Sequence, residues 1–287
     1  MINSNNITFT DNKGKDHWTV SGSKYLSIED KSGSETYKIT DSKNDSVTDY
    51  SGNDTYRILD SENISVTDIK GNDKYTLKSV TLDESHIITD HAGSDTYYLK
   101  SSTAVVTDYK GTDTYKIADS KKTRVYDTST KSGDTYKIDK ITGVTTIVDY
   151  GGKDNLTISS AKRKNLVYMA NFKSDGSGVD NGSLIIFDKT KSGAVIIRNY
   201  FETEESSEKT MITKTKSDGY IETIKADTTK INSYINKFVS NTDLDALSSD
   251  VASWLSNNSH RYSDVNNLLT SGSADDISNF IATFVQQ

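Results

Sequence analysis

Apolar and polar residues alternate along the first half of the chain in short runs separated by polar turns. In Val47–Ile58, a turn containing Asp49, Gly52 and Asp54 separates two such runs. Alternation with a period of two favours half-buried strands, and the turn residues favour a tight reversal of the chain. The same pattern returns at Val66–Leu77 and at Val106–Ile117. The predicted building unit is therefore a strand, a turn and a second strand.

The unit recurs with a period of about 19 residues. Its first aspartate is a convenient anchor, and the anchors are Asp11, Asp30, Asp49, Asp68, Asp90, Asp108, Asp127 and Asp149. The intervals between them are 19, 19, 19, 22, 18, 19 and 22 residues. This period is too short for the common helical repeats and suits a coil of two short strands and two turns. The sequence predicts an all-β solenoid of about eight coils over residues 1–160.

Each position of the unit keeps its chemical character from copy to copy. An apolar residue stands two positions before the anchor, as Phe9, Ile28, Val47, Val66, Ile88, Val106, Val125 and Ile147. Glycine stands three positions after it, as Gly14, Gly33, Gly52, Gly71, Gly93, Gly111 and Gly152. A second acid stands five positions after it, as Asp16, Glu35, Asp54, Asp73, Asp95, Asp113 and Asp154, with Asp134 in the seventh copy, whose turn is longer. An aromatic residue follows in most copies, as Trp18, Tyr37, Tyr56, Tyr75, Tyr97, Tyr115 and Tyr136.

Strand parity places both acids on the inner side of the coil. Side chains alternate across a strand, so the anchor acid shares a face with the apolar residue before it, and the second acid with the aromatic residue after it. If the coils stack about 4.8 Å apart, like charges repel by roughly 3–4 kcal/mol at an effective dielectric near 20. Two columns of inward acids therefore require neutralisation.

Hard divalent cations resolve this conflict. Calcium takes six to eight oxygen ligands from carboxylates and backbone carbonyls, and glycine permits a left-handed turn that aims carbonyls inward. We therefore predict calcium ions in one row between coils, with the acids of both columns, from Asp11 to Asp154, as ligands. The alternative is that Asp, Gly and Asn simply make good turns. The opposite turn lacks glycine and its acids do not align, as at Asp41–Asn44 and Asp60–Asn63, so no second row is expected.

The repeated turn resembles the calcium-binding nonapeptide of RTX (haemolysin-type) proteins, G-G-x-G-x-D-x-U-x, where U is a large apolar residue. Asp49–Tyr56 (DYSGNDTY) matches at the third glycine, the aspartate and the apolar position, while its first glycine is replaced by Asp. Gly151–Leu156 comes closest to the consensus. The resemblance spans about residues 7–160. It implies a right-handed parallel β-roll that folds on binding calcium, in proteins that an ABC transporter exports by type I secretion.

After the repeats the pattern changes twice. Residues 161–226 contain apolar runs at Asn165–Phe172, Gly182–Asp188 and Ala194–Phe201, which predict a β-strand cap that closes the solenoid. Val195–Phe201 and Gly219–Asp227 resemble the segment that closes many RTX rolls. Residues 227–287 change to helical periodicity, which predicts a small helical region that packs on the roll or serves as an uncleaved export signal.

Composition narrows the function further. The net charge of −7 argues against nucleic acid as the main partner, and the absence of cysteine excludes disulfides and zinc-thiolate sites. The sequence contains no run of about 18 apolar residues, so we expect no transmembrane helix. The first residues also lack the apolar segment of a secretory signal peptide. No catalytic motif or triad is recognisable, so we expect no enzymatic activity.

These patterns support two main hypotheses about function and a third. The first is an extracellular calcium-binding structural or secretion module, without catalysis, that folds after export. The second is a calcium-dependent surface adhesin or matrix protein that binds a glycan or cell-surface partner through the cap or through a basic ladder of Lys38, Arg57, Lys116 and Lys137. A third, weaker one is the non-catalytic tail of a secreted enzyme or toxin.

Overall fold

The computed structural model describes residues 5–130, 132–151, 154–160, 166–172, 179–188, 194–198, 210–215 and 221–225. These residues form strands and turns, and no helix occurs among them. They accordingly contain no helix long and apolar enough to cross a membrane. The helical region expected at 227–287 lies outside the described residues, as does Gly152.

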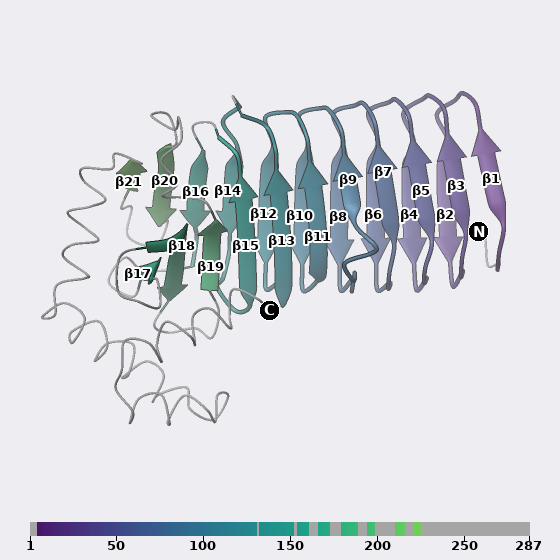
Figure 1. Ribbon diagram of the computed structural model, residues 1–287. Helices are drawn as coiled ribbons and strands as arrows, with labels where there is room; N and C mark the ends of the chain where they lie inside the picture. Colours follow the sequence, from purple (N-terminus) through teal and green to yellow (C-terminus); the bar gives the residue numbers. More distant parts are fainter. Residues whose placement is uncertain are drawn as a thin grey trace, which may run out of the picture.

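Two parallel sheets face each other along the length of the repeats (Figure 1). The first sheet contains β1 (Thr8–Asp11), β3 (Ser27–Asp30), β5 (Ser46–Asp49), β7 (Ser65–Asp68), β9 (Ile88–Asp90), β11 (Thr103–Asp108), β13 (Lys122–Asp127) and β15 (Val144–Asp149). The second contains β2 (His17–Ser21), β4 (Thr36–Thr40), β6 (Thr55–Leu59), β8 (Lys74–Lys78), β10 (Thr96–Lys100), β12 (Thr114–Ala118), β14 (Thr135–Ile138) and β16 (Asn155–Ile158). The chain alternates between the sheets, so each odd strand and the next even strand make one coil.

The register of the sheets aligns equivalent positions of successive copies. Asp30 pairs with Asp49 in the first sheet, and Tyr37 pairs with Tyr56 in the second. Where two anchor aspartates are 22 residues apart, the extra residues lie outside the strands, because Asp68 still pairs with Asp90. The predicted parallel β-solenoid of about eight coils is therefore confirmed.

Aliphatic and tyrosine columns fill the space between the two sheets. In every strand from β3 to β14, inward residues are buried and alternate with more exposed ones. Successive tyrosines from Tyr37 to Tyr136 stack with ring centroids 4.7–5.0 Å apart and ring planes within 7° of parallel. Stacking on an identical neighbour lets a chain with only 33% hydrophobic residues build a continuous core.

The turn at the opposite end of the coils holds a column that the sequence reasoning missed. Ser42, Ser61 and Ser102 are buried there, and each hydroxyl donates to the carbonyl two residues earlier at 2.7–2.9 Å. The left-handed backbone positions also lie at this turn, and non-glycine residues such as Asn44 and Asn63 occupy them. Asparagine tolerates this conformation better than most residues. The expectation that this turn lacks glycine was wrong for the first coil, where Gly22 has a left-handed backbone with φ of 66°.

Beyond the repeats, pairing becomes antiparallel at the end of both sheets (Figure 1). The added strands are β17 (Leu166–Phe172), β18 (Val179–Asp188), β19 (Ala194–Arg198), β20 (Thr210–Thr215) and β21 (Ile221–Lys225). β19 extends the first sheet in parallel with β15, and β18 and β17 then follow it as antiparallel strands. β20 pairs in parallel with β16 and carries β21 antiparallel. Strands were expected at β17, β18, β19 and β21, whereas β20 was not predicted.

Candidate metal centre

Two acid columns line one end of the coils, on either side of the turn from the first sheet to the second. The first column consists of the residues that end β1, β3, β5, β7, β9, β11, β13 and β15: Asp11, Asp30, Asp49, Asp68, Asp90, Asp108, Asp127 and Asp149. The second consists of the residues that precede β2, β4, β6, β8, β10, β12, β14 and β16: Asp16, Glu35, Asp54, Asp73, Asp95, Asp113, Asp134 and Asp154. Each coil thus contributes one acid from each sheet.

Both columns point inward, as the parity of the strands predicts. From Asp30 to Asp154, the acids of the two columns are at most 5% exposed. Asp11 and Asp16 are only partly buried because they belong to the terminal coil of the described stack. The inward orientation therefore holds fully wherever a coil has neighbours on both sides.

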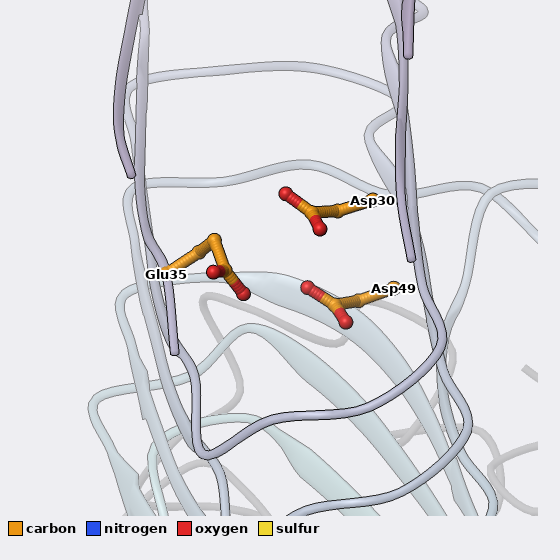
Figure 2. Close-up of side chains that lie close together, drawn as sticks. All are labelled: Asp30, Glu35 and Asp49. Atoms are coloured by element: carbon orange, nitrogen blue, oxygen red, sulfur yellow. The ribbon is translucent and has the colours of Figure 1, made fainter. Parts of the chain in front are cut away.

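Acids from successive coils converge at this end of the solenoid. Figure 2 shows Asp30 and Asp49, from β3 and β5, facing Glu35 from the entrance of β4. One carboxylate oxygen from each lies within 4.8 Å of the others, a spacing at which one cation can contact all three. Two acids of the first column and one of the second also meet at Asp49/Asp54/Asp68 and Asp68/Asp73/Asp90, whereas Asp95/Asp108/Asp113 and Asp113/Asp127/Asp134 contain one of the first column and two of the second. Each of these groups combines acids of two successive coils.

The first column is organised by hydrogen bonds on both carboxylate oxygens. One oxygen of Asp68 accepts the backbone N–H of Lys70 at 3.1 Å, which fixes the start of the turn. The other accepts the phenol O–H of Tyr56 from the preceding coil at 2.7 Å. This tyrosine bond repeats from Tyr37 to Tyr136 with distances of 2.6–2.9 Å. The tyrosine column thus positions the acids, a role that the sequence reasoning missed.

Trp18 interrupts this scheme at the start of the stack. It takes the place of a tyrosine, but its indole N–H has no partner, and one oxygen of Asp30 is likewise buried without one. All later first-column acids accept a tyrosine hydroxyl. In the sequence, tryptophan in place of tyrosine at position 18 marks the coil in which this hydrogen bond is missing.

The second column leaves oxygens without hydrogen-bond partners. One oxygen of Asp73 accepts the backbone N–H of Asp54 at 2.5 Å, and this bond repeats along the column at up to 2.9 Å. The second carboxylate oxygen has no hydrogen-bond partner in Asp54, Asp73, Asp95 and Asp113. In Glu35 neither carboxylate oxygen has a partner. A buried polar atom left unpaired costs about 1–3 kcal/mol, and more when charged. A row of such oxygens could serve as the donor set of a cation site.

Glycine in the turn is required for space. At Gly71, an added Cβ would lie 2.2 Å from the carbonyl oxygen of Gly52 and 2.4 Å from a carboxylate oxygen of Asp73. Most glycines at this position of the repeat, including Gly71, do not have a positive φ. Gly111 has a φ of 159°, which is close to extended backbone. The prediction of a left-handed turn was therefore wrong. The glycine is needed because backbone carbonyl and carboxylate oxygens gather where a side chain would otherwise stand.

Burial raises the pKa values of the stacked acids, and neighbouring acids add to the effect. Loss of solvation raises the pKa of Asp49 to about 6, of Asp113 to about 7 and of Asp95 to about 8. Burial, with repulsion from Asp113, raises the pKa of Asp108 to about 9. Burial also holds the pKa of Tyr75 well above its ordinary value, so this phenol remains a hydrogen-bond donor. Without a cation, the columns hold protons that ordinary acids would release.

The residues present fit a hard divalent cation. The candidate ligand atoms are carboxylate oxygens, with glycine carbonyls close to them, and the five acid groups named above contain no histidine or cysteine. Oxygen-only donor sets suit calcium, magnesium or manganese better than softer metals. Asp45, a buried acid at the opposite turn, is instead bonded by the Ser23 hydroxyl and by the Leu26 N–H at 2.9 Å.

Comparison with known proteins adds no family to this description. No family model matches the chain, and no curated protein or solved structure matches it either. What is established is a parallel β-solenoid of about eight coils with buried acid groups that could hold metal ions.

Proposed function

We propose that this chain is a calcium-binding repeat protein of the RTX type, whose solenoid folds when calcium binds outside the cell after type I secretion. It acts as a structural or secretion module without catalytic activity. The observation that carries the proposal is the row of buried, unpartnered carboxylate oxygens along the second acid column. Its regular spacing explains why inward acids recur in every copy, which turn propensity alone does not.

Metal binding and folding of the solenoid are coupled in this proposal. Without cations, the columns bring acids of successive coils within 4.8 Å in a buried environment, which disfavours the folded chain. A cation that binds only the folded state stabilises it by mass action. Calcium scarcity inside a cell would keep the chain open for export, and millimolar calcium outside would close it. The export step rests on the resemblance of the turn to RTX repeats.

The proposal predicts calcium-dependent folding at neutral pH. Far-UV circular dichroism should show a strong β-sheet signal and a cooperative thermal transition in calcium, and a weaker signal with a much lower melting temperature in a chelator. Magnesium should restore less structure, because it keeps part of its water shell and demands a near-ideal octahedral site. Equal β content and equal melting temperature in calcium and chelator would show that the acids do not hold structural metal.

Metal-free and calcium-loaded protein should respond to pH in opposite directions. In the metal-free chain the pKa of Asp95 is about 8 when folded, above its usual value near 4, so the folded state binds more protons. Stability without metal should be greatest below about pH 4 and fall as pH rises toward about 8–9, through the raised pKa values of Asp95 and Asp108. Calcium competes with these protons, so its stabilising effect should grow with pH. Calorimetric melting at several pH values measures both trends, and a metal-free melting temperature that climbs from acid to neutral pH would contradict the account.

A further inference from the structure

The outer face of the second sheet carries a concentration of positive charge in an acidic protein. The outward positions of six of its strands, β4, β6, β8, β10, β12 and β14, hold seven cations: Lys38, Arg57, Lys74, Lys78, Lys100, Lys116 and Lys137. No Asp or Glu occupies an outward position in these strands, although the chain as a whole has a net charge of −7. We call this surface the basic face.

The register places like charges of the basic face directly beside each other. Lys38 pairs with Arg57, Lys78 with Lys100 and Lys116 with Lys137. Like charges at opposite positions of neighbouring strands destabilise a sheet. The ion pairs found among the described residues, such as Lys140 with Asp119 at 3.4 Å, include none of the seven. The positive charge is therefore not neutralised within the face.

Positive charge is concentrated on one side of the solenoid. At the outward positions of the first sheet, β5 and β7 carry hydroxyl side chains (Ser46, Thr48, Ser65 and Thr67), and the two cations of β13 are Lys122 and Arg124, of which Arg124 pairs with Glu84. Exposed Lys70 and Lys110, at the turn with the acid columns, extend the positive field beyond the edge of the second sheet. Solubility would be served by charges on either face, so this segregation indicates a surface for an anionic partner.

We propose that the basic face binds an acidic polysaccharide, one that carries carboxylate or sulfate groups. The face is a flat strip of six strands, about 24 Å long for five strand spacings of about 4.8 Å, which suits a linear polyanion. A column of threonines, interrupted at Lys74, runs beside the cations as Thr36, Thr55, Thr96, Thr114 and Thr135. Cations attract the acidic groups, and the threonine hydroxyls exchange hydrogen bonds with the hydroxyls of the sugar.

Other polyanions fit this surface less well. Single-stranded nucleic acid binds on rows of aromatic side chains, whereas Tyr98 is the one aromatic residue at an outward position in the six strands of the basic face. A flat sheet face does not enter the groove of a duplex. Membrane surfaces need apolar side chains to insert, and the exposed large apolar residues, among them Tyr25, Tyr50 and Tyr109, lie outside these strands.

This inference goes beyond the proposed calcium function and does not rest on it. The acid columns lie inside the turn, whereas the basic face is the outer surface of β4 to β14. Polysaccharide binding requires only that the solenoid is folded, whatever ion or proton stabilises it.

The test compares two variants with the same change in net charge. The test variant is K38Q/K116Q/K137Q, on the basic face, and the control is K24Q/K121Q/K122Q, outside it. Chondroitin sulfate is titrated into the folded full chain by calorimetry, in calcium, at low and at roughly threefold higher salt, with neutral dextran as the uncharged comparison. Wild type should bind chondroitin sulfate, bind it more weakly at higher salt, and ignore dextran. The test variant should bind at least about tenfold more weakly, and the control within about twofold of wild type.

Several outcomes would overturn the proposal. They are no binding of chondroitin sulfate by wild type, equal weakening of binding in both variants, or equal binding of neutral dextran and chondroitin sulfate. Tighter binding to a single-stranded oligonucleotide or to vesicles of anionic phospholipid would reject the polysaccharide class. Circular dichroism of each variant shows whether the solenoid is folded, so failure of the calcium proposal is read separately from failure of this one.

Discussion

Replacing Tyr75 with alanine is expected to lower the free energy of unfolding by about 3–5 kcal/mol, the usual cost of removing a large buried aromatic ring. Tyr75 is 1% exposed and stacks between Tyr56 and Tyr97 at 4.8 and 4.7 Å. Its loss leaves a cavity in the middle of the column and removes both stacking contacts. Chemical denaturation in calcium measures the effect.

A conservative change at the same position separates packing from hydrogen bonding. Tyr75→Phe keeps the ring but leaves an oxygen of Asp90 without the hydroxyl that it accepts at 2.6 Å. This loss should cost about 1–3 kcal/mol. Tyr109→Ala, at an exposed tyrosine, should cost less than about 1 kcal/mol. If Tyr75→Phe were as stable as wild type, the tyrosine column would serve packing alone.

Asp73→Asn is expected to change stability in opposite directions with and without calcium. Asp73 lies in the group with Asp68 and Asp90, and one of its oxygens has no partner. In calcium, the amide is a poorer ligand, and loss of one ion bound at 100 to 1,000 times its dissociation constant should cost about 2.7–4.1 kcal/mol. In a chelator near neutral pH, the same change removes a buried charge and gives the neighbouring acids a donor. It should then stabilise the fold by about 1–3 kcal/mol.

The matched control is Asp60→Asn, which makes the same charge change at the opposite turn. Asp60 is exposed and has a left-handed backbone that asparagine adopts readily. Its stability should change by less than about 0.5 kcal/mol in either condition. If Asp73→Asn moved stability in the same direction with and without calcium, the acids would be turn formers and the metal interpretation would fail.

The solenoid and its acid columns were predictable because both follow from local patterns. Period-two alternation fixes which side of a strand is buried, and the 19-residue repeat fixes which residues pair between coils. Together these two patterns are enough to place Asp49 and Asp54 on the inner side of the coil. Asp11 obeys the same pattern, but it belongs to a terminal coil and is only partly buried.

The features that were missed depend on contacts across the interior. The bond from Tyr56 to Asp68 joins residues of different sheets, so neither strand pattern reveals it. The role of Gly71 depends on where the carbonyl of Gly52 in the neighbouring coil points. The buried column that includes Ser42 looks like ordinary turn composition until the hydroxyls are seen to bond to the backbone. β20 follows no repeat, so no column supports its prediction.

A calorimetric titration of the metal-free chain with calcium tests the central claim most directly. The structure brings together acids of successive coils, as at Asp30, Glu35 and Asp49, so each ion should be shared between two coils. The account predicts a stoichiometry near one ion for each interface between coils, with binding accompanied by gain of β structure. Absence of calcium binding, or a folded solenoid that takes up no ions at neutral pH, would contradict it.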